Sequence, residues 1–568
     1  MPSWAPINIY RLSSWARSTV VPLLVVNHHR PVFALPNGTD ADNDFLDELW
    51  LNPNNKHVPY SGGFWDLVAK LNYFDLTFVA VDKAIKWLGG LRKRNPLRQF
   101  ALHECLQWII SRQEREGDWA GIFPPMHVGV LAYVLSGYKL DDAPVRLALE
   151  AIERFVWKDE TGMRVQACVS PVWDTVLMAS ALSAADRFQD TRAVSLRKRG
   201  LDWVRRHQIL GSEGDWRVYR PYNTPGGFSF EYFNRWYPDV DDTCAAIIAF
   251  LKDDPRSASS QHVLDAVKWV LGMQCMDGGW AAFDVENDRL WLNRIPFSDM
   301  DALCDPPTSD IVGRVLEAFG LLLLTAFQRK LYLDERIRPI LDRVRRASGR
   351  GIQWLACTQQ RDGSWYGRWG VNYLYGTSNA LAGLAYFCCP ESDDNMPPQS
   401  QHKGEMQSHH AMVKRAVAYL VSAQNPDGGW GESLNSYEST SQSEIGAVGI
   451  KTQHDPGVST PSQTAWGLIG ILPYLPTDHP AIVQGIRWLL EHQTERSLKS
   501  ATLNKALLVS KGLTWDGKWY TGTGFPRHFY LGYTLYSHYF PMMALTEYSK
   551  YHLQEQSGAR SGLLEEKQ

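Results

Sequence analysis

Residues 263–280, VLDAVKWVLGMQCMDGGW, contain the pattern that decides the fold. Apolar residues recur at helical spacing through the first half of this stretch, and the Asp-Gly-Gly sequence near its end is typical of a tight turn. Trp269 lies five residues before Gln274, and Trp280 lies six residues after it. The stretch therefore predicts a helix that ends in a turn, with a Trp, a Gln and a second Trp at fixed distances.

The same pattern recurs along the chain, which identifies an internal repeat. Four further copies are Trp108, Gln113 and Trp119; Trp203, Gln208 and Trp216; Trp354, Gln359 and Trp365; and Tyr419, Gln424 and Trp430. A sixth copy, with Trp488 and Gln493, is interrupted by an insertion and is expected to close at Trp519. Successive Gln residues lie 65 to 95 residues apart, which leaves room for two helices in each repeat. This period predicts an α/α barrel, in which inner and outer helices alternate.

The composition argues against several classes of protein. The 58 Lys and Arg residues nearly balance the 61 Asp and Glu residues, for a net charge of −3, so the basic footprint of a nucleic-acid-binding protein is missing. No apolar run reaches the ~18 residues of a membrane-spanning helix, and the N-terminus lacks the pattern of a signal peptide. Trp is unusually frequent, with 23 residues, which indicates a structural or chemical need for flat aromatic faces.

Three carboxylates are crowded into Asp239-Val240-Asp241-Asp242-Thr243, between an aromatic stretch and an apolar helix. In a site of low dielectric constant such neighbours cannot all ionise readily, so at least one should keep its proton above its ordinary pKa. That group would be a neutral acid at about pH 7. From spacing alone three interpretations stay open: a helix cap, a Mg²⁺ site or an acid catalyst.

Together with the repeats, several longer motifs resemble those of the squalene-hopene cyclases and, more distantly, the oxidosqualene cyclases. They are SPVWDT (170–175), PDVDDT (238–243), GRWGVNYLYGT (367–377), STPSQTAW (459–466) and TGTGFPRHFYLGYTLYSHYFP (521–541). The resemblance covers nearly the whole chain and implies an all-α protein with two α/α barrel domains. We expect a first barrel over 1–168, incomplete at its N-terminus and with a membrane-facing surface, a catalytic barrel over 169–556 and a disordered tail over 557–568.

The resemblance also implies an activity. The family folds a C30 polyene among aromatic side chains and closes it by a cationic cascade, so we expect squalene or 2,3-oxidosqualene as substrate and a pentacyclic hopane-type triterpenoid as product. No metal and no organic cofactor are expected. The family further implies a peripheral, monotopic membrane protein on the cytosolic side and suggests a homodimer. Residues 64–74 are a candidate membrane helix, with ordinary barrel packing as the alternative, and residues 295–297 a candidate channel mouth.

Carried over position by position, Asp241 resembles the family's proton donor, flanked by Asp239 and Asp242. Asp174 and Asp310 resemble its supporting carboxylates. The residues that match substrate-binding aromatic side chains are Trp173, Phe230, Phe283, Trp369, Tyr375, Phe525, Phe529, Tyr533 and Tyr536. Aromatic faces suit this chemistry because they stabilise a carbocation without trapping it as a lone pair would. For each aromatic residue taken alone, packing in the core is the simpler interpretation.

Three positions depart from the family's pattern. Arg314 stands where bacterial hopene cyclases can carry a His beside the catalytic Asp. Its permanent charge favours a carboxylate at that Asp, yet it also stabilises the conjugate base after proton transfer. An epoxide is easier to protonate than an alkene, so oxidosqualene stays open as a substrate. Phe283 and Phe123 stand where a Tyr and a Gln are expected, and the loss of these polar groups favours deprotonation or early termination over a hydroxylated product.

Other functions stay open from the sequence. A class II diterpene or meroterpenoid cyclase could use the same acid on a shorter prenyl chain, although the motifs that continue to Tyr536 argue against it. A carbohydrate-processing α/α barrel is also rich in Trp and carboxylates, and it predicts a wet cleft with paired acids. An inactive lipid-binding remnant would fold normally and bind a polyene without turnover.

Overall fold

The computed structural model describes residues 5, 8–31, 44, 46–54, 73–90, 96–160, 162–232, 234–295, 302–388, 403–438, 456–499, 509–558 and 560. The chain divides into two compact units. The larger unit comprises Met1–Ser14, Val169–Leu290 and Ala302–Gln568, and the smaller unit comprises Trp15–Cys168 and Trp291–Asp301.

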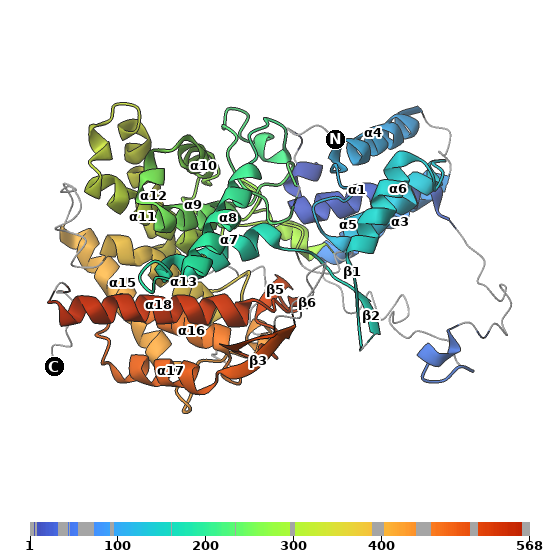
Figure 1. Cartoon of the computed structure of the whole chain (residues 1–568). Helices are drawn as coiled ribbons and strands as arrows, with labels where there is room; N and C mark the ends of the chain where they lie inside the picture. The colour runs from blue at the N-terminus through green and yellow to red at the C-terminus, as the bar shows by residue number, and fades with distance from the viewer. Residues whose placement is uncertain are drawn as a thin grey trace. The chain divides into compact units, whose positions relative to one another are not determined.

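The larger unit is an α/α barrel. Among its described residues, six helices pack side by side in a closed ring, in which α18, the long red helix of Figure 1, returns to contact α7. These inner helices are α7 (Pro171–Ala181), α9 (Val240–Asp253), α11 (Ser309–Gln328), α13 (Tyr373–Cys388), α16 (Pro461–Ile471) and α18 (Tyr536–Gln556). The outer helices that cover them are α8 (Thr191–Arg206), α10 (Gln261–Gly272), α12 (Arg338–Thr358), α15 (Lys403–Ser422) and α17 (Pro480–Glu491). The predicted all-α fold with alternating inner and outer helices is confirmed.

The inner and outer helices differ in how completely they are buried. Every residue of α9 from Val240 to Leu251 is buried, whereas α10 buries mainly the apolar residues that recur at helical spacing. The inner helices α11 and α13 approach each other closely because Gly313 and Gly383 face one another. A methyl group on either glycine would collide with the backbone of the other helix. These glycines therefore set the spacing of α11 and α13.

The Gln residues of the repeats join successive helices, Gln113 within the smaller unit and the other four within the barrel. Each side-chain amide donates two hydrogen bonds of 2.8 to 3.1 Å to backbone carbonyls, one of a glycine in the following turn and one of a later helix of the same unit. The pairs of acceptors are Gly117 and Pro144 for Gln113, Gly226 and His262 for Gln208, Gly278 and Ala347 for Gln274, Gly363 and Met412 for Gln359, and Gly428 and Ala481 for Gln424. The first bond pairs a carbonyl of the turn, and the second adds a contact from that turn to the following helix.

The closing Trp of a repeat donates its indole N–H to the helix before it. Trp119, Trp280, Trp365 and Trp430 donate to the carbonyls of Ile109, Val270, Leu355 and Leu420, respectively, at 2.8 to 2.9 Å. In the sixth repeat the equivalent bond comes from Trp515, to Leu489 at 2.7 Å. The expectation that Trp519 closes this repeat is therefore wrong, and Trp519 is 61% exposed.

The insertion explains that error. It contains the hairpin of β3 (Thr494–Lys499) and β4 (Val509–Thr514), in which Thr494 pairs with Thr514. The hairpin brings the chain back to its starting point, so the next residue, Trp515, takes the closing position. Spacing along the sequence cannot show where such a hairpin returns.

The second repeat needs a similar correction. Gln208 bonds to Gly226, and Phe228 follows two residues later, as Trp280 follows Gly278. Phe228 is fully buried and takes the closing position, whereas Trp216 lies within an insertion and packs edge-on against Trp269. The sequence pattern assigned Trp216 as the closing residue because it required a Trp, whereas this repeat closes with a Phe.

The smaller unit is also mainly helical. Its helices are α1 (Ser14–His29), α3 (Tyr73–Gly90), α4 (Pro96–Arg112), α5 (Phe123–Leu135) and α6 (Ala143–Arg154), followed by the antiparallel strands β1 (Val156–Asp159) and β2 (Gly162–Val165). A further hairpin, β5 (Gly522–Phe525) with β6 (Phe529–Leu531), belongs to the larger unit. Among the described residues, no helix combines the length and apolar character that crossing a membrane requires. Residues 64–72, 296–297 and 561–568, for which the sequence suggested roles, lie outside the described residues.

The corrected sixth repeat yields a test of the fold. Substitution Trp515→Phe keeps a buried ring but removes the N–H that Leu489 accepts, so we expect the free energy of unfolding to fall by about 1–3 kcal/mol. Trp519→Phe serves as the matched control and should change stability by less than about 0.5 kcal/mol. Urea denaturation of both full-length variants measures the difference. A larger loss in the Trp519 variant would restore the assignment made from spacing.

Candidate active site

The backbone of a repeat's closing residue fixes the start of an inner helix. Phe228 accepts a 2.7 Å hydrogen bond from the Asp239 N–H and donates its own N–H to the Thr243 hydroxyl at 2.9 Å. Trp430 makes the same two contacts with Thr460 and Thr464 at the start of α16. The turns held by the Gln residues therefore determine where the inner helices begin.

The three clustered carboxylates have different local roles. Asp239 caps α9, because its Oδ1 accepts the backbone N–H groups of Asp241 at 2.6 Å and Asp242 at 3.3 Å. Capping, one of the interpretations left open, thus describes Asp239. Asp241 and Asp242 follow in the first helical turn and are 8% and 1% exposed. Neither side chain caps the helix.

Asp241 forms a buried ion pair with Arg314 of α11. The guanidinium Nε lies 3.1 Å from Asp241 Oδ1, and the guanidinium carbon lies 5.8 Å from the centre of the Trp173 ring. Trp173 in turn donates its indole N–H to the Tyr536 hydroxyl at 3.1 Å. The structure therefore brings together four of the residues expected at the site, from α7, α9, α11 and α18.

Burial dominates the electrostatics of the cluster. It raises the pKa of Asp241 to about 6, although the neighbouring Arg314 opposes the rise and the charge of Asp310 adds to it. Burial also raises the pKa of Asp239 and Asp242 well above the ordinary range, and the other carboxylates of the cluster add to both shifts. One guanidinium thus reduces the cost of ionising Asp241 without restoring an ordinary carboxylate.

The two supporting carboxylates hold other parts of the site. Asp310 Oδ2 accepts the backbone N–H groups of Arg368 and Trp369, each at 2.8 Å, and so positions the Trp369 backbone. Asp174 accepts hydrogen bonds from Ser170 at 2.8 Å and Tyr539 at 3.2 Å, and burial raises its pKa. In the part of the chain that the structure describes, no group of three or more His, Cys, Asp or Glu residues is arranged to hold a metal ion.

The expected aromatic residues form contacting pairs. Their ring centroids lie 4.4 Å apart for Tyr533 and Tyr536, 6.1 Å for Phe283 and Trp369, 6.3 Å for Phe525 and Phe529, and 6.4 Å for Phe230 and Tyr533. Tyr375 is buried beside Asp241, whose charge raises its pKa further. Phe529 is the outlier, because it is 37% exposed. Of these rings, Trp173, Tyr375 and Tyr536 lie in the immediate surroundings of the Asp241–Arg314 pair.

Four residues of this region were not singled out from the sequence. The ring centroids of Trp466 and Tyr375 lie 4.7 Å apart. The Arg368 guanidinium carbon lies 4.3 Å from the centre of the Trp369 ring. Glu317 forms an ion pair with Arg314. Asp305 accepts the backbone N–H groups of Phe283 and Asp284, and burial raises its pKa to about 7. Trp466 and Arg368 lie within the quoted motifs, so attention to every residue of those motifs would have found them.

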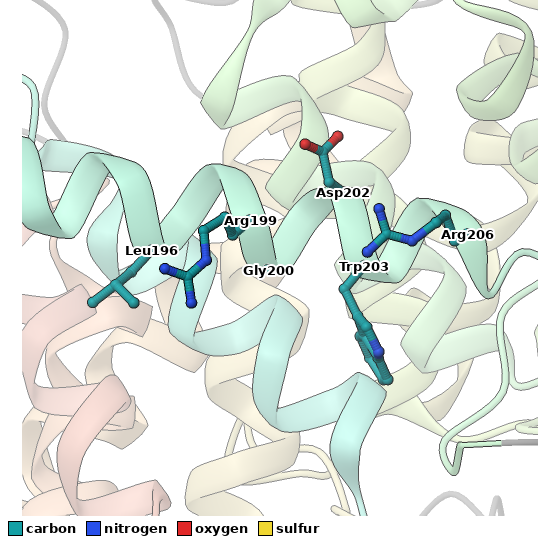
Figure 2. Close-up of a pocket in the computed structure, with 6 residues that line it drawn as sticks. All are labelled: Leu196, Arg199, Gly200, Asp202, Trp203 and Arg206. Atoms are coloured by element: carbon teal, nitrogen blue, oxygen red, sulfur yellow. The ribbon is translucent and has the colours of Figure 1, made fainter. Parts of the chain in front are cut away.

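A separate surface pocket of about 480 Å³ is lined by residues of α8 (Figure 2). The residues that line it are Leu196, Arg199, Gly200, Asp202, Trp203 and Arg206. Its carboxylate, Asp202, is exposed and pairs with Arg205 at 3.1 Å. A solvent-exposed carboxylate on a surface pocket does not provide the buried surroundings of Asp241, so this pocket does not offer the same chemistry.

Comparisons with known proteins agree on one family. The model of the squalene-hopene cyclase C-terminal domain matches residues 169–550, and that of the N-terminal domain matches residues 1–161. The squalene hopane cyclase of Aspergillus fumigatus is 48% identical over 516 residues, which are 87% of this chain and 65% of that protein. The enfumafungin synthase of Hormonema carpetanum is 44% identical over 552 residues, or 96% of this chain and 39% of that protein.

A bacterial relative is covered more fully. The probable squalene-hopene cyclase of Sinorhizobium fredii is 33% identical over 551 residues, which are 96% of this chain and 74% of that protein. The chain therefore spans 39 to 74% of the length of these three relatives.

Proposed function

Because this chain belongs to the squalene-hopene cyclase family, we propose that it is a triterpene cyclase acting on squalene or 2,3-oxidosqualene. The product would be a pentacyclic hopane-type triterpenoid. The observation that carries this proposal is Asp241, a buried carboxyl with a pKa of about 6 among aromatic side chains. A protonated acid in dry, π-rich surroundings is what an unactivated alkene requires.

In the proposed first step, Asp241 donates its proton to a terminal double bond or to the epoxide oxygen. With squalene, the π electrons form the new C–H bond and a tertiary carbocation remains, which the next double bond attacks. Arg314, 3.1 Å from Asp241, stabilises the carboxylate left behind. Asp239 supports the acid by holding the Asp241 backbone N–H at the start of α9.

The aromatic residues would stabilise the moving positive charge. A desolvated cation over an aromatic face gains roughly 2 kcal/mol or more. The stacked Tyr533 and Tyr536, the Phe283–Trp369 pair and the ring of Phe230 offer such faces on several sides. Transfer of a proton from the adjacent carbon to a water molecule ends the cascade and restores an alkene, and the proposed reaction is redox-neutral and needs no redox cofactor.

The proposal extends to the organisation and location of the chain. Residues 169–556 are proposed as the catalytic barrel, residues 1–168 as a partial first barrel with a membrane-facing surface, and residues 557–568 as a tail. Since the substrate is insoluble in water, we propose a peripheral, monotopic association with the cytosolic side of a membrane. Assembly as a homodimer is part of the same proposal and rests on the family alone.

Product analysis of an Asp241→Asn variant tests the proposed acid. The amide cannot donate the initiating proton, so we expect cyclisation to fall at least about a hundredfold while the fold is retained. Detergent-solubilised full chain is incubated with squalene and, separately, with 2,3-oxidosqualene, and products are identified by mass spectrometry. Asp202→Asn makes the same change at the exposed pocket and should keep wild-type activity.

Other outcomes would point elsewhere. Equal activity of the Asp241→Asn and Asp202→Asn variants would exclude Asp241 as the proton donor. A folded wild-type chain that binds polyene without forming product would support the inactive remnant. Turnover of a shorter prenyl substrate alone would support the diterpene or meroterpenoid cyclase.

The Phe283→Tyr variant tests how the cascade ends. Phe283 packs edge-on against Trp369 and offers no hydroxyl. Adding one gives water a hydrogen-bond partner near the rings, so we expect the ratio of hydroxylated to deprotonated product to rise severalfold. Gas chromatography with mass detection measures this ratio, and Phe283→Leu, which adds no polar group, is the control. An unchanged ratio in the active Tyr variant would contradict a role for this position in termination.

A further inference from the structure

Arg314 has two carboxylate partners, the buried Asp241 and the half-buried Glu317. Its Nε lies 3.1 Å from Asp241 of α9, and its Nη1 lies 3.2 Å from Glu317, one turn later on α11. The side chains of the three residues are only 10 to 15% exposed. Spacing of three residues places Arg314 and Glu317 on the same face of the helix, so the contact follows from the local sequence.

The presence of two carboxylates beside one guanidinium makes Asp241 easier to protonate. A guanidinium that faces a single carboxylate forms a neutral pair, which resists protonation because a proton would leave a net buried charge of +1. With Glu317 included, the three ionised groups have a net charge of −1, and a proton on Asp241 brings the cluster to neutrality. The second carboxylate thus makes protonation of Asp241 compatible with a permanent cation beside it.

Building on the proposed function, we propose that Glu317 is a positioning residue that shares Arg314 with Asp241 and thereby keeps Asp241 in its proton-donating form. Glu317 lies beyond Arg314 and acts on the acid through that guanidinium, so it is not expected to touch substrate. None of the longer motifs that carry the family resemblance includes it.

Other ionisable groups also face Asp241 from the elements packed around it. They are Asp239, Asp242 and Cys244 on α9, Asp310 on α11, Tyr375 on α13 and Tyr536 on α18, and Asp174 on α7 acts on the neighbouring Asp242 and Tyr536. The carboxylates of Asp239, Asp310 and Asp174 are engaged by backbone or hydroxyl donors. Glu317 differs from these groups because it binds Arg314 directly.

The Glu317→Gln variant tests the inference. The amide keeps the size and an acceptor for Arg314 but removes the charge, so the guanidinium is left to Asp241 alone. We expect the descending limb of the pH–rate profile to move about one pH unit lower, and the rate above both midpoints to fall about tenfold. Glu317→Asp retains the charge and should keep the midpoint within about 0.3 pH units of wild type.

A second readout does not need turnover. The infrared band of the protonated Asp241 carboxyl, isolated by subtraction of the Asp241→Asn spectrum, is titrated in wild type and in Glu317→Gln without substrate. The same downward shift supports the inference. An unmoved titration midpoint in the folded variant, or a rate lowered equally at every pH, would overturn it. A wild-type chain without product would count against the proposed function, whereas the infrared titration would still decide the role of Glu317.

If the Glu317→Gln variant does not fold, the same question can be asked in a background that lacks Arg314. The same titration compares the Arg314→Gln single variant with the double variant that carries both Arg314→Gln and Glu317→Gln. If Glu317 acts mainly by sharing Arg314, its removal in this background should lower the midpoint by less than it does beside Arg314, because only its direct charge effect on Asp241 remains. A full shift of about one unit in this background would contradict action through the guanidinium.

Discussion

The hydrogen bonds between repeat turns and helix starts are the interactions on which the rest of the barrel depends. A Gln amide holds a glycine turn, and two residues after that glycine the backbone of Phe228 fixes the first residues of α9. Asp239 caps that helix, and Asp241 follows in its first turn. The acid is therefore positioned by backbone hydrogen bonds rather than by a flexible loop, and the same arrangement recurs at Trp430 and α16.

The chemistry at this position is a balance between burial and one cation. Burial is the largest influence on the pKa of Asp241, and Arg314 opposes it only in part, so the carboxyl keeps a raised pKa. A guanidinium alone would favour the ionised form. Its sharing between Asp241 and Glu317 reconciles a permanent positive charge with an acid that must give up a proton.

The sequence allowed much of this organisation to be predicted. Helical spacing and the Trp-Gln-Trp pattern predicted the α/α barrel, because both are repeated local features. The predictions for Trp216 and Trp519 were wrong for a related reason: insertions bring Phe228 and Trp515 to the closing positions instead. Distance along the chain does not reveal where an insertion returns.

The site was predictable only in its residue types. Crowded carboxylates near aromatic residues suggested an acid, but capping by Asp239 and the ion pair of Asp241 depend on which helices meet. Glu317 has no local signature of this role, since its contact with Arg314 matters only when α9 brings Asp241 to the same guanidinium. Asp305 acts on the backbone of a distant segment and has no local signature.

The central claim is that an exchangeable proton held by a buried carboxyl starts the reaction. Cyclisation of squalene in D₂O tests it most directly, because Asp241 would carry deuterium and transfer it to carbon, where it does not exchange. The account predicts a polycyclic product with a single deuterium at the carbon protonated first, found by mass spectrometry and NMR. An unlabelled polycycle would contradict it, since the initiating proton would then not come from a solvent-exchangeable acid.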